Sequence, residues 1–218
     1  MTTLRPAFAG RFFTPGRNPS ERRKKMKNTR KMASIAVMAA VAMLLQFIEF
    51  SIPIIPSFIK LDFSDIPELI IAFAYGPLSG CIVCLLKNLI HMPLSGSGFI
   101  GELSNFLLGC CFVVPAGLIY KKNKTKKGAL IGSLTGAVVM GICSFPLNYF
   151  LIYPLYMNVL GFPYEAIVGM YQAILPAADT LVKGLLIFNV PFTIVKGLIC
   201  AAVTFLIYKR LSPILKKS

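Results

Sequence analysis

Residues 66–93 read IPELIIAFAYGPLSGCIVCLLKNLIHMP, an apolar stretch with Tyr75-Gly76-Pro77-Leu78 near its middle. A helix needs about 20 apolar residues to cross the hydrocarbon core of a bilayer. Proline removes a backbone donor and restricts the residue before it, so Gly76-Pro77 predicts a stop followed by a tight turn. The first piece, 66–76, would span only roughly 16 Å as a helix. We therefore expect it to begin near Ser64 or to sit sunken within a bundle.

The Lys and Arg clusters decide whether this stretch crosses the membrane once or twice. Nineteen of the 23 Lys and Arg residues lie in the chain up to Lys31, in Lys121–Lys127 and in Lys209–Lys217. Positive clusters favour the cytoplasmic side of a membrane. All three clusters reach that side only if Gly76-Pro77 is an inner turn between two crossings. With four further apolar blocks, 33–50, 99–120, 128–153 and 184–208, the count is six crossings with both termini in the cytoplasm.

The composition excludes a soluble domain. Of the 218 residues, 56% are hydrophobic and only 14% are charged, and the mean hydropathy is +0.73. A soluble domain carries nearer 25% charge, and a disordered chain is far less apolar. The sequence therefore predicts an all-α integral membrane protein of the plasma membrane. We expect a six-transmembrane-helix bundle in which the first and fifth connecting outer loops, Ser51–Ser64 and Tyr153–Lys183, are long.

The ends of the chain are expected to lie outside this bundle. Residues 1–31 contribute most of the net charge of +15 and have no apolar core of a signal peptide. We interpret them as a basic disordered tail, with a start assigned too early, before Met26 or Met32, as the alternative. The membrane domain is expected to cover 32–212, and 213–218 to form a cytoplasmic tail. Basic residues beside apolar runs favour a membrane flank over nucleic-acid binding.

The six-crossing topology places the polar chemistry on the outer side. All seven acidic residues that follow the basic tail then fall in outer loops or near the outer ends of segments. The second long loop contains an apolar stretch, Tyr164–Leu175, that predicts a short interfacial helix. Loops of this length often cover a binding site. The alternative is that they only seal the end of the bundle.

Several polar side chains lie within the expected spanning segments, where they are expensive and therefore candidates for function. Their amide, hydroxyl and charged groups next to aromatic walls describe a pocket for one small planar polar molecule. Interhelical hydrogen bonding is the alternative for each Asn, and Lys87 and His91 favour a structural role paired with an acid. The candidates are Lys87, His91, Glu102, Asn105, Ser144, Asn148, Asn189, Thr193 and Lys196.

Motifs of other classes are missing from the sequence. All six cysteines lie within apolar runs, which favours plain packing over a disulfide framework or a metal site. His91 is the only histidine, and no phosphate loop, HExxH or Ser-His-Asp order occurs. We therefore expect no metal, no cofactor and no enzymatic activity. An intramembrane enzyme using Glu102 and His91 remains the alternative of another class, with a passive channel as a third.

Small residues mark two helix faces where a backbone can approach closely. Ala36-x-x-x-Ala40 lies on the first apolar block. Gly128, Gly132 and Gly136 repeat every four residues on the block 128–153. Each face fits either a partner helix or packing within the bundle, and the glycines favour internal packing.

Six strings in order over residues 30–212 carry a resemblance to a known family. They are Lys60-Leu-Asp-Phe-Ser-Asp-Ile-Pro67, Gly76-Pro-Leu-x-Gly80, Leu86-Lys-Asn-Leu-Ile-His91, Gly101-Glu-Leu-x-Asn-Phe106, Asn148-Tyr149 and Asn189-Val-Pro-Phe-x-x-x-Lys-Gly197. On these strings the chain resembles the S components, the substrate-binding subunits, of energy-coupling factor (ECF) transporters, and specifically the riboflavin type.

This resemblance implies a six-helix protein that binds riboflavin from outside as its transported ligand. It implies work with a transmembrane coupling protein and two cytoplasmic ATPases, and Ala36 and Ala40 match the family's motif that faces the coupling protein. Thr193 stands where the family often has Asn. An S component for another vitamin or small heterocyclic metabolite is the alternative of the same class. The residues that match the family's flavin site are Leu61, Asp62, Phe63, Glu102, Asn105, Asn148 and Lys196, and Thr193 occupies a further site position at which this chain departs from the family.

Overall fold

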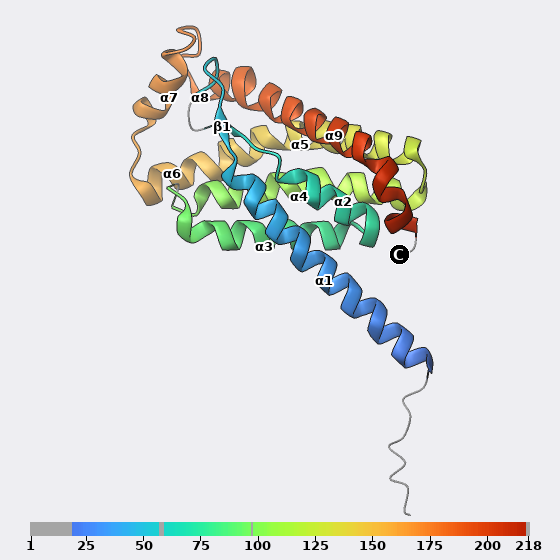
Figure 1. Cartoon of the computed structure of the whole chain (residues 1–218). Coiled ribbons are helices and arrows are strands. Elements are labelled where there is room, and N and C mark those ends of the chain that lie inside the picture. Colours follow the sequence, from blue (N-terminus) through green and yellow to red (C-terminus); the bar gives the residue numbers. More distant parts are fainter. Residues whose placement is uncertain (1–18, 57–58, 97, 217–218) are drawn as a thin grey trace, which may run out of the picture.

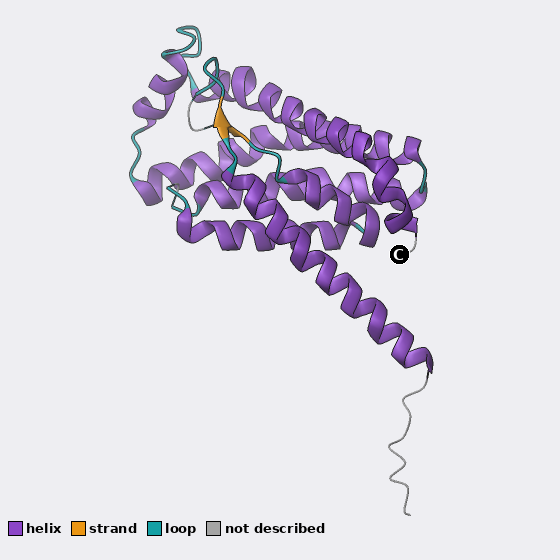
Figure 2. Ribbon diagram, viewed as in Figure 1, coloured by secondary structure: helices purple, strands orange, loops and turns teal. Residues whose placement is uncertain are grey.

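The computed structural model describes residues 19–56, 59–96 and 98–216, and it is built almost entirely of helices (Figures 1 and 2). The helices and strands, in chain order, are α1 (Pro19–Phe47), β1 (Phe50–Ser51), β2 (Lys60–Leu61), α2 (Asp65–Tyr75), α3 (Pro77–His91), the 3-10 turn η1 (Met92–Leu94), α4 (Ile100–Lys122), α5 (Lys126–Leu147), the π-helical segment η2 (Asn148–Ile152), α6 (Tyr153–Leu160), α7 (Tyr164–Gln172), α8 (Leu181–Gly184), the π-helical segment η3 (Leu185–Asn189) and α9 (Val190–Lys216).

Helices α2, α3, α4, α5 and α9 run side by side, and the two ends of this bundle differ (Figure 1). One end carries β1, β2, α6, α7 and α8, and we call it the loop-rich end. The opposite end carries the α2–α3 turn, the α4–α5 connection with its lysines and the end of α9, and we call it the lysine-rich end. The expected turn at Gly76-Pro77 therefore lies at the same end as Lys121–Lys127.

Five helical stretches within the described residues are long and apolar enough to cross a membrane. They are Lys25–Phe47, Pro77–Leu94, Ile100–Lys122, Lys126–Leu160 and Leu181–Ile207. The expected additional crossing, α2, has only 11 residues. Eight of them are buried, which matches the expectation of a short helix sunken within the bundle.

The N-terminal helix begins earlier than expected. Pro19–Lys31, interpreted as part of a disordered tail, forms the first turns of α1, because Lys and Arg are good helix formers that extend a helix already started by the apolar block. Residues 1–18 of that tail lie outside the described residues. Of the described side chains before Ile35, none is buried, and this half of α1 runs away from the bundle (Figure 1). At the other end, α9 continues to Lys216, into the segment expected as a tail.

Both expected outer loops contain regular structure. In Ser51–Ser64, strand β2 pairs antiparallel with β1, with Phe50 opposite Leu61 and Ser51 opposite Lys60. In Tyr153–Lys183 the chain forms α6, α7 and the start of α8 (Figure 2). The short helix expected within Tyr164–Leu175 is confirmed as α7.

The turn between α2 and α3 depends on Gly76. Its φ of +95° lies in a region that side chains with a Cβ rarely adopt. One turn later, a Cβ on Gly80 would lie 2.9 Å from the Glu68 carbonyl oxygen, so glycine also permits the close approach of the two helices. These two glycines explain how the chain reverses direction between the 11-residue helix α2 and helix α3, and how the two helices then pack closely.

The glycines of α5 face other helices of the bundle rather than a partner. A Cβ on Gly132 would lie 2.7 Å from the Ala116 carbonyl oxygen of α4, and one on Gly136 would lie 2.5 Å from the Phe112 carbonyl oxygen. A Cβ on Gly141 would lie 2.1 Å from the Ile194 side chain of α9. The expectation of internal packing is therefore confirmed for Gly132 and Gly136.

We predict that Gly136→Ala lowers the midpoint of thermal unfolding in detergent, because the added methyl group forces α5 away from α4 at a cost of about 1–3 kcal/mol. Leu134→Ala is the control, since Leu134 lies on the exposed face of the same helix. An unchanged midpoint for Gly136→Ala would show that the two helices are not in close contact there.

Candidate functional site

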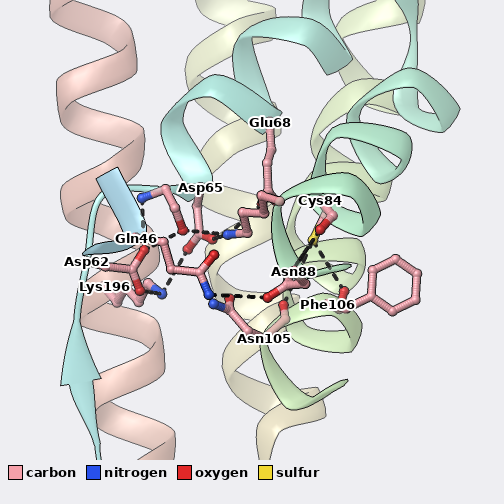
Figure 3. Close-up of polar contacts among 11 residues, drawn as sticks. Gln46, Asp62, Asp65, Glu68, Cys84, Asn88, Asn105, Phe106 and Lys196 are labelled. Atoms are coloured by element: carbon pink, nitrogen blue, oxygen red, sulfur yellow. Dashed lines mark hydrogen bonds and ion pairs between the residues drawn. The ribbon is translucent and has the colours of Figure 1, made fainter. Parts of the chain in front are cut away.

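Two buried lysines and three buried carboxylates form one connected network beneath the loop-rich end (Figure 3). The Lys196 Nζ lies 2.8 Å from the Asp62 Oδ2 and 3.4 Å from the Asp65 Oδ2. The Lys87 Nζ lies 2.6 Å from the Glu68 Oε1 and 3.3 Å from the Asp65 Oδ1. Asp65 therefore bridges the two lysines, and the network joins the β2–α2 connection to α3 and α9.

The carboxylates reach this position because the chain turns sharply after β2. The Asp62 Oδ1 accepts a hydrogen bond from the Ser64 backbone N–H at 2.8 Å, and the Ser64 hydroxyl bonds the same carboxylate. The turn starts α2 at Asp65, which places Asp65 and Glu68 in the first helical turn, where the helix dipole favours negative charge. The Ser64 hydroxyl also accepts a hydrogen bond from the Lys87 Nζ.

Asp62 stays ionised in this setting. Burial by itself raises the pKa of the Asp62 carboxyl, but the ammonium groups of Lys196 and Lys87 outweigh it and hold the pKa well below its ordinary value. A lowered folded-state pKa means that the stabilisation is complete above the unfolded value of about 3.9 and is lost only as the pH falls below it. The Asp62–Lys196 pair therefore persists across neutral and mildly acidic pH.

Burying charges costs several kcal/mol per ion unless each charge is paired with good geometry. In this network every ammonium has at least two oxygen neighbours, and the five residues are between 0% and 9% exposed. The arrangement therefore fixes the position of the β2–α2 connection against α3 and α9, and it is costly to break.

Glu102 and His91 form a second buried pair. The His91 Nδ1 lies 3.0 Å from the Glu102 Oε1, which joins the end of α3 to the first turn of α4. The Phe47 ring of α1 lies 5.0 Å from the His91 ring. The expected pairing of Lys87 and of His91 with an acid is confirmed.

Two other polar residues of the sequence analysis lie in π-helical segments. Asn148 is the first residue of η2, and its Nδ2 donates to the Ser144 carbonyl oxygen at 2.8 Å. Asn189 is the last residue of η3. Both side chains are buried. π-Helical turns are rare and often lie at functional sites, and here each one leads a bundle helix into the loop-rich end.

The eight predicted site residues lie toward the loop-rich end on four different elements. Asp62 and Lys196 are in direct contact, and Leu61 is buried beside them in β2. Phe63 is partly buried, with its ring 6.0 Å from that of Phe50.

The remaining four come from α4, α5–η2 and α9. Glu102 pairs with His91, and Asn105 is partly buried one turn further along α4, near the network (Figure 3). Asn148 and Thr193 are buried on α5–η2 and α9, two helices that pack closely.

The prediction missed residues that complete these contacts. Asp65 and Glu68 supply three of the four carboxylate contacts to the two buried lysines. Gln46 of α1 donates from its Nε2 to the Asn88 Oδ1 at 3.4 Å. A lysine in the middle of an apolar block signals that an acid must lie nearby. The sequence does not say which acid, because the partner comes from another helix.

A cleft of about 360 Å³ lies at the same end, beside the predicted residues rather than among them. The side chains that line it are aromatic or aliphatic: Tyr149 and Phe150 from η2, Pro154 and Met157 from α6, Tyr164 from α7, and Leu181 and Val182 from α8. Its neighbours are α6, α7 and α8. The buried polar residues and this apolar cleft are therefore adjacent parts of one end of the molecule.

Residues 30–208 match the family model described as "ECF transporter, substrate-specific component". The chain belongs to this family. It is 35% identical to "Riboflavin transporter RibU" of Staphylococcus aureus over 196 residues, covering 90% of this chain and 97% of that protein. It is 32% identical to "Riboflavin transporter FmnP" of Bacillus subtilis over 164 residues, covering 74% of this chain and 83% of that protein.

A solved structure leads to the same family. The protein in "Structure and mechanism of the S component of a bacterial ECF transporter" superposes with a TM-score of 0.68 at 35% identity, covering 87% of this chain and 99% of that one. This ECF substrate-specific component is therefore a multi-pass membrane protein and part of a transporter. The alternative of an intramembrane enzyme is set aside, because the family and its relatives are transporters.

We predict that Lys87→Met destabilises the protein by about 3–5 kcal/mol, because it leaves the Glu68 and Asp65 carboxylates buried without their partner. Adding Glu68→Gln to this variant should recover part of the loss. The matched control is Lys60→Met, which breaks the exposed Lys60–Glu49 pair and should cost about 0–1 kcal/mol. Equal thermal midpoints for Lys87→Met and Lys60→Met would contradict the network.

Proposed function

We propose that this chain binds riboflavin and serves as the substrate-specificity subunit of an ATP-driven ECF transporter. The observation that carries the proposal is its likeness to the S. aureus riboflavin transporter over nearly the full length of both chains. The matches to riboflavin transporters of Bacillus subtilis and Streptococcus thermophilus, at 32% and 36% identity, support the same ligand.

We place the riboflavin site between the β2–α2 connection and helices α4, α5 and α9. The amide groups of Asn105 and Asn148 and the hydroxyl of Thr193 supply donors and acceptors for the heterocycle. Leu61 and Phe63 supply apolar contact. The ammonium group of Lys196 has three donors; Asp62 and Asp65 engage two, and we assign the third to the ligand.

Glu102 has a different role in this proposal. Its carboxylate is paired with His91, so it holds α4 against α3 while it borders the site. The apolar cleft beside α6 and α7 lies next to this site and offers aromatic surface along the route of entry.

The proposed topology has six crossings, with the loop-rich end outside and both chain termini in the cytoplasm. The positions of the α4–α5 lysines and of the α2–α3 turn at one end of the bundle support it (Figure 1). In this topology α2 enters the membrane only part of the way. Its carboxylates are shielded from water, and ion pairs with Lys87 and Lys196 compensate their charge.

We propose that Ala36 and Ala40 face the transmembrane coupling protein, which acts with two ATPases. Both alanines are exposed, whereas Ile35, Ala39 and Ala42, which point to another side of α1, are buried. Packing within the bundle therefore does not occupy them. Small residues spaced by four let the backbone of a partner helix approach closely in a membrane.

We predict that the purified chain quenches riboflavin fluorescence with one site per chain, and that Asn148→Ala weakens the affinity about tenfold by removing one buried hydrogen bond. Asn158→Ala is the control, because Asn158 is exposed on α6 at the same end. Equal affinities of the two variants would show that Asn148 does not contact the ligand, and an absence of any binding would contradict the proposed ligand.

We predict that Ala36→Trp or Ala40→Trp abolishes riboflavin uptake in cells that supply the coupling protein and the ATPases, while the purified variants bind riboflavin normally. The bulky ring prevents the close helix contact without touching the site. Ala202→Trp is the control, since it adds the same ring to an exposed position of α9. Uptake at the wild-type rate by both α1 variants would refute the assignment of this face.

A further inference from the structure

Helix α7 is held at the loop-rich end through one face only. Ile167, Val168 and Tyr171 pack into a cluster with residues of α6, α8 and η3. The Tyr164 hydroxyl accepts a hydrogen bond from the Leu181 N–H at 3.2 Å. The other face of α7 is exposed, and the chain enters the helix after Gly161, whose φ is +68°. Few contacts therefore have to break for α7 to move.

Tyr171 makes the central polar contact of this attachment. Its hydroxyl donates to the Asn189 Oδ1 of η3 at 2.7 Å and is hydrogen-bonded to the Tyr153 hydroxyl of α6. The Asn189 Nδ2 donates to the Tyr153 hydroxyl at 3.5 Å. The three side chains thus close a ring that joins α6, α7 and η3. Burial raises the pKa of Tyr171, so its hydroxyl stays protonated at any pH of a binding assay.

The position of the Tyr171 ring also depends on a glycine, which leaves room for the ring to pack. A Cβ on Gly184 of α8 would lie 2.7 Å from the Tyr171 Cδ2 and 2.8 Å from its Cγ. On the other side, the Phe188 ring lies 5.6 Å from the Tyr171 ring. Tyr171 is fully buried as a result, although it belongs to a surface helix.

This ring of hydrogen bonds lies directly beyond the proposed site. Asn189 precedes Thr193 by four residues and Lys196 by seven, so the three share one helical face. Tyr153 follows Asn148 by five residues, and the Tyr153 N–H donates to the Asn148 carbonyl oxygen within the π-helical turn. The two helical runs that carry Asn148 and Thr193 therefore each carry one partner of Tyr171 about one turn further out.

We propose that Tyr171 is a latch that closes α7 over the binding site, and that the ligand enters and leaves only while Tyr171 is detached from Asn189. This inference rests on the proposed function, since it concerns access to the riboflavin site. The hydrogen bonds of the latch join Tyr171, Asn189 and Tyr153 to one another and include none of the proposed ligand contacts. Weakening it destabilises the closed state with and without ligand alike. The association and dissociation rates then rise together, and the affinity changes little.

The test is stopped-flow fluorescence of riboflavin with the purified full-length chain. Tyr171→Phe removes one buried hydroxyl and should raise both rate constants about three- to tenfold, with less than a twofold change in their ratio. Tyr75→Phe is the matched control, because its hydroxyl is hydrogen-bonded to Ser34 at the lysine-rich end. It should leave both rates unchanged.

A second pair of variants tests the packing of the Tyr171 ring without removing the Tyr171 hydroxyl. Gly184→Ala pushes the Tyr171 ring outward and should raise both rates in the same way. Gly169→Ala is the control on α7 itself, since a Cβ there meets nothing within 4 Å.

The outcomes separate this inference from the function on which it rests. A faster dissociation with an unchanged association rate would make Tyr171 a ligand contact and overturn the latch. Unchanged rates in both Tyr171→Phe and Gly184→Ala would overturn it as well. A wild-type chain that fails to bind riboflavin would overturn the proposed function first.

Discussion

Lys87 and Lys196 are placed deep inside an apolar bundle, and the rest of the structure depends on neutralising them. An unpaired ammonium group in such an interior costs several kcal/mol or more. The acids that neutralise them all come from Asp62–Glu68, so this segment has to turn inward directly after β2. That constraint explains why α2 is short and buried, why the turn at Gly76 is tight, and why the β1–β2 pair sits over the bundle.

The sequence predicted the parts of this fold that depend on local rules. A proline after a glycine marks a turn wherever it occurs, and the counts of Lys and Arg place that turn at the same end as Lys121–Lys127. The partners of Lys87 and Lys196 were beyond prediction from the residues, because they depend on how each helix is rotated about its axis. The helical start of α1 was missed for another reason: composition alone does not distinguish a basic disordered segment from a basic helix that continues an apolar one.

The predicted site separates into two zones with different physical roles. Asp62, Glu102 and Lys196 form a charged layer with the residues paired to them, and in the proposed site only the third donor of Lys196 is left for the ligand. Asn105, Asn148 and Thr193 lie with them, and the last two belong to the two helices that carry π-helical segments. A π-helical turn accommodates one extra residue and turns the following side chains to a new direction. This change of direction brings Tyr153 to the Tyr171 ring, and no spacing rule based on a regular helix reveals it.

The distribution of strong and weak contacts favours one kind of motion over another. The ionic network, the Glu102–His91 pair and the glycine-mediated contacts of α5 fasten α2, α3, α4, α5 and α9 to one another. Rearranging these helices would expose several buried charges at once. Helix α7, in contrast, is attached through one face. A site built this way is opened most cheaply by moving α7. The Ala36 and Ala40 face proposed for the coupling protein lies on α1, and α1 packs on α2 and α3, the helices that the network holds. A partner at this face would therefore contact the rigid part of the bundle rather than α7.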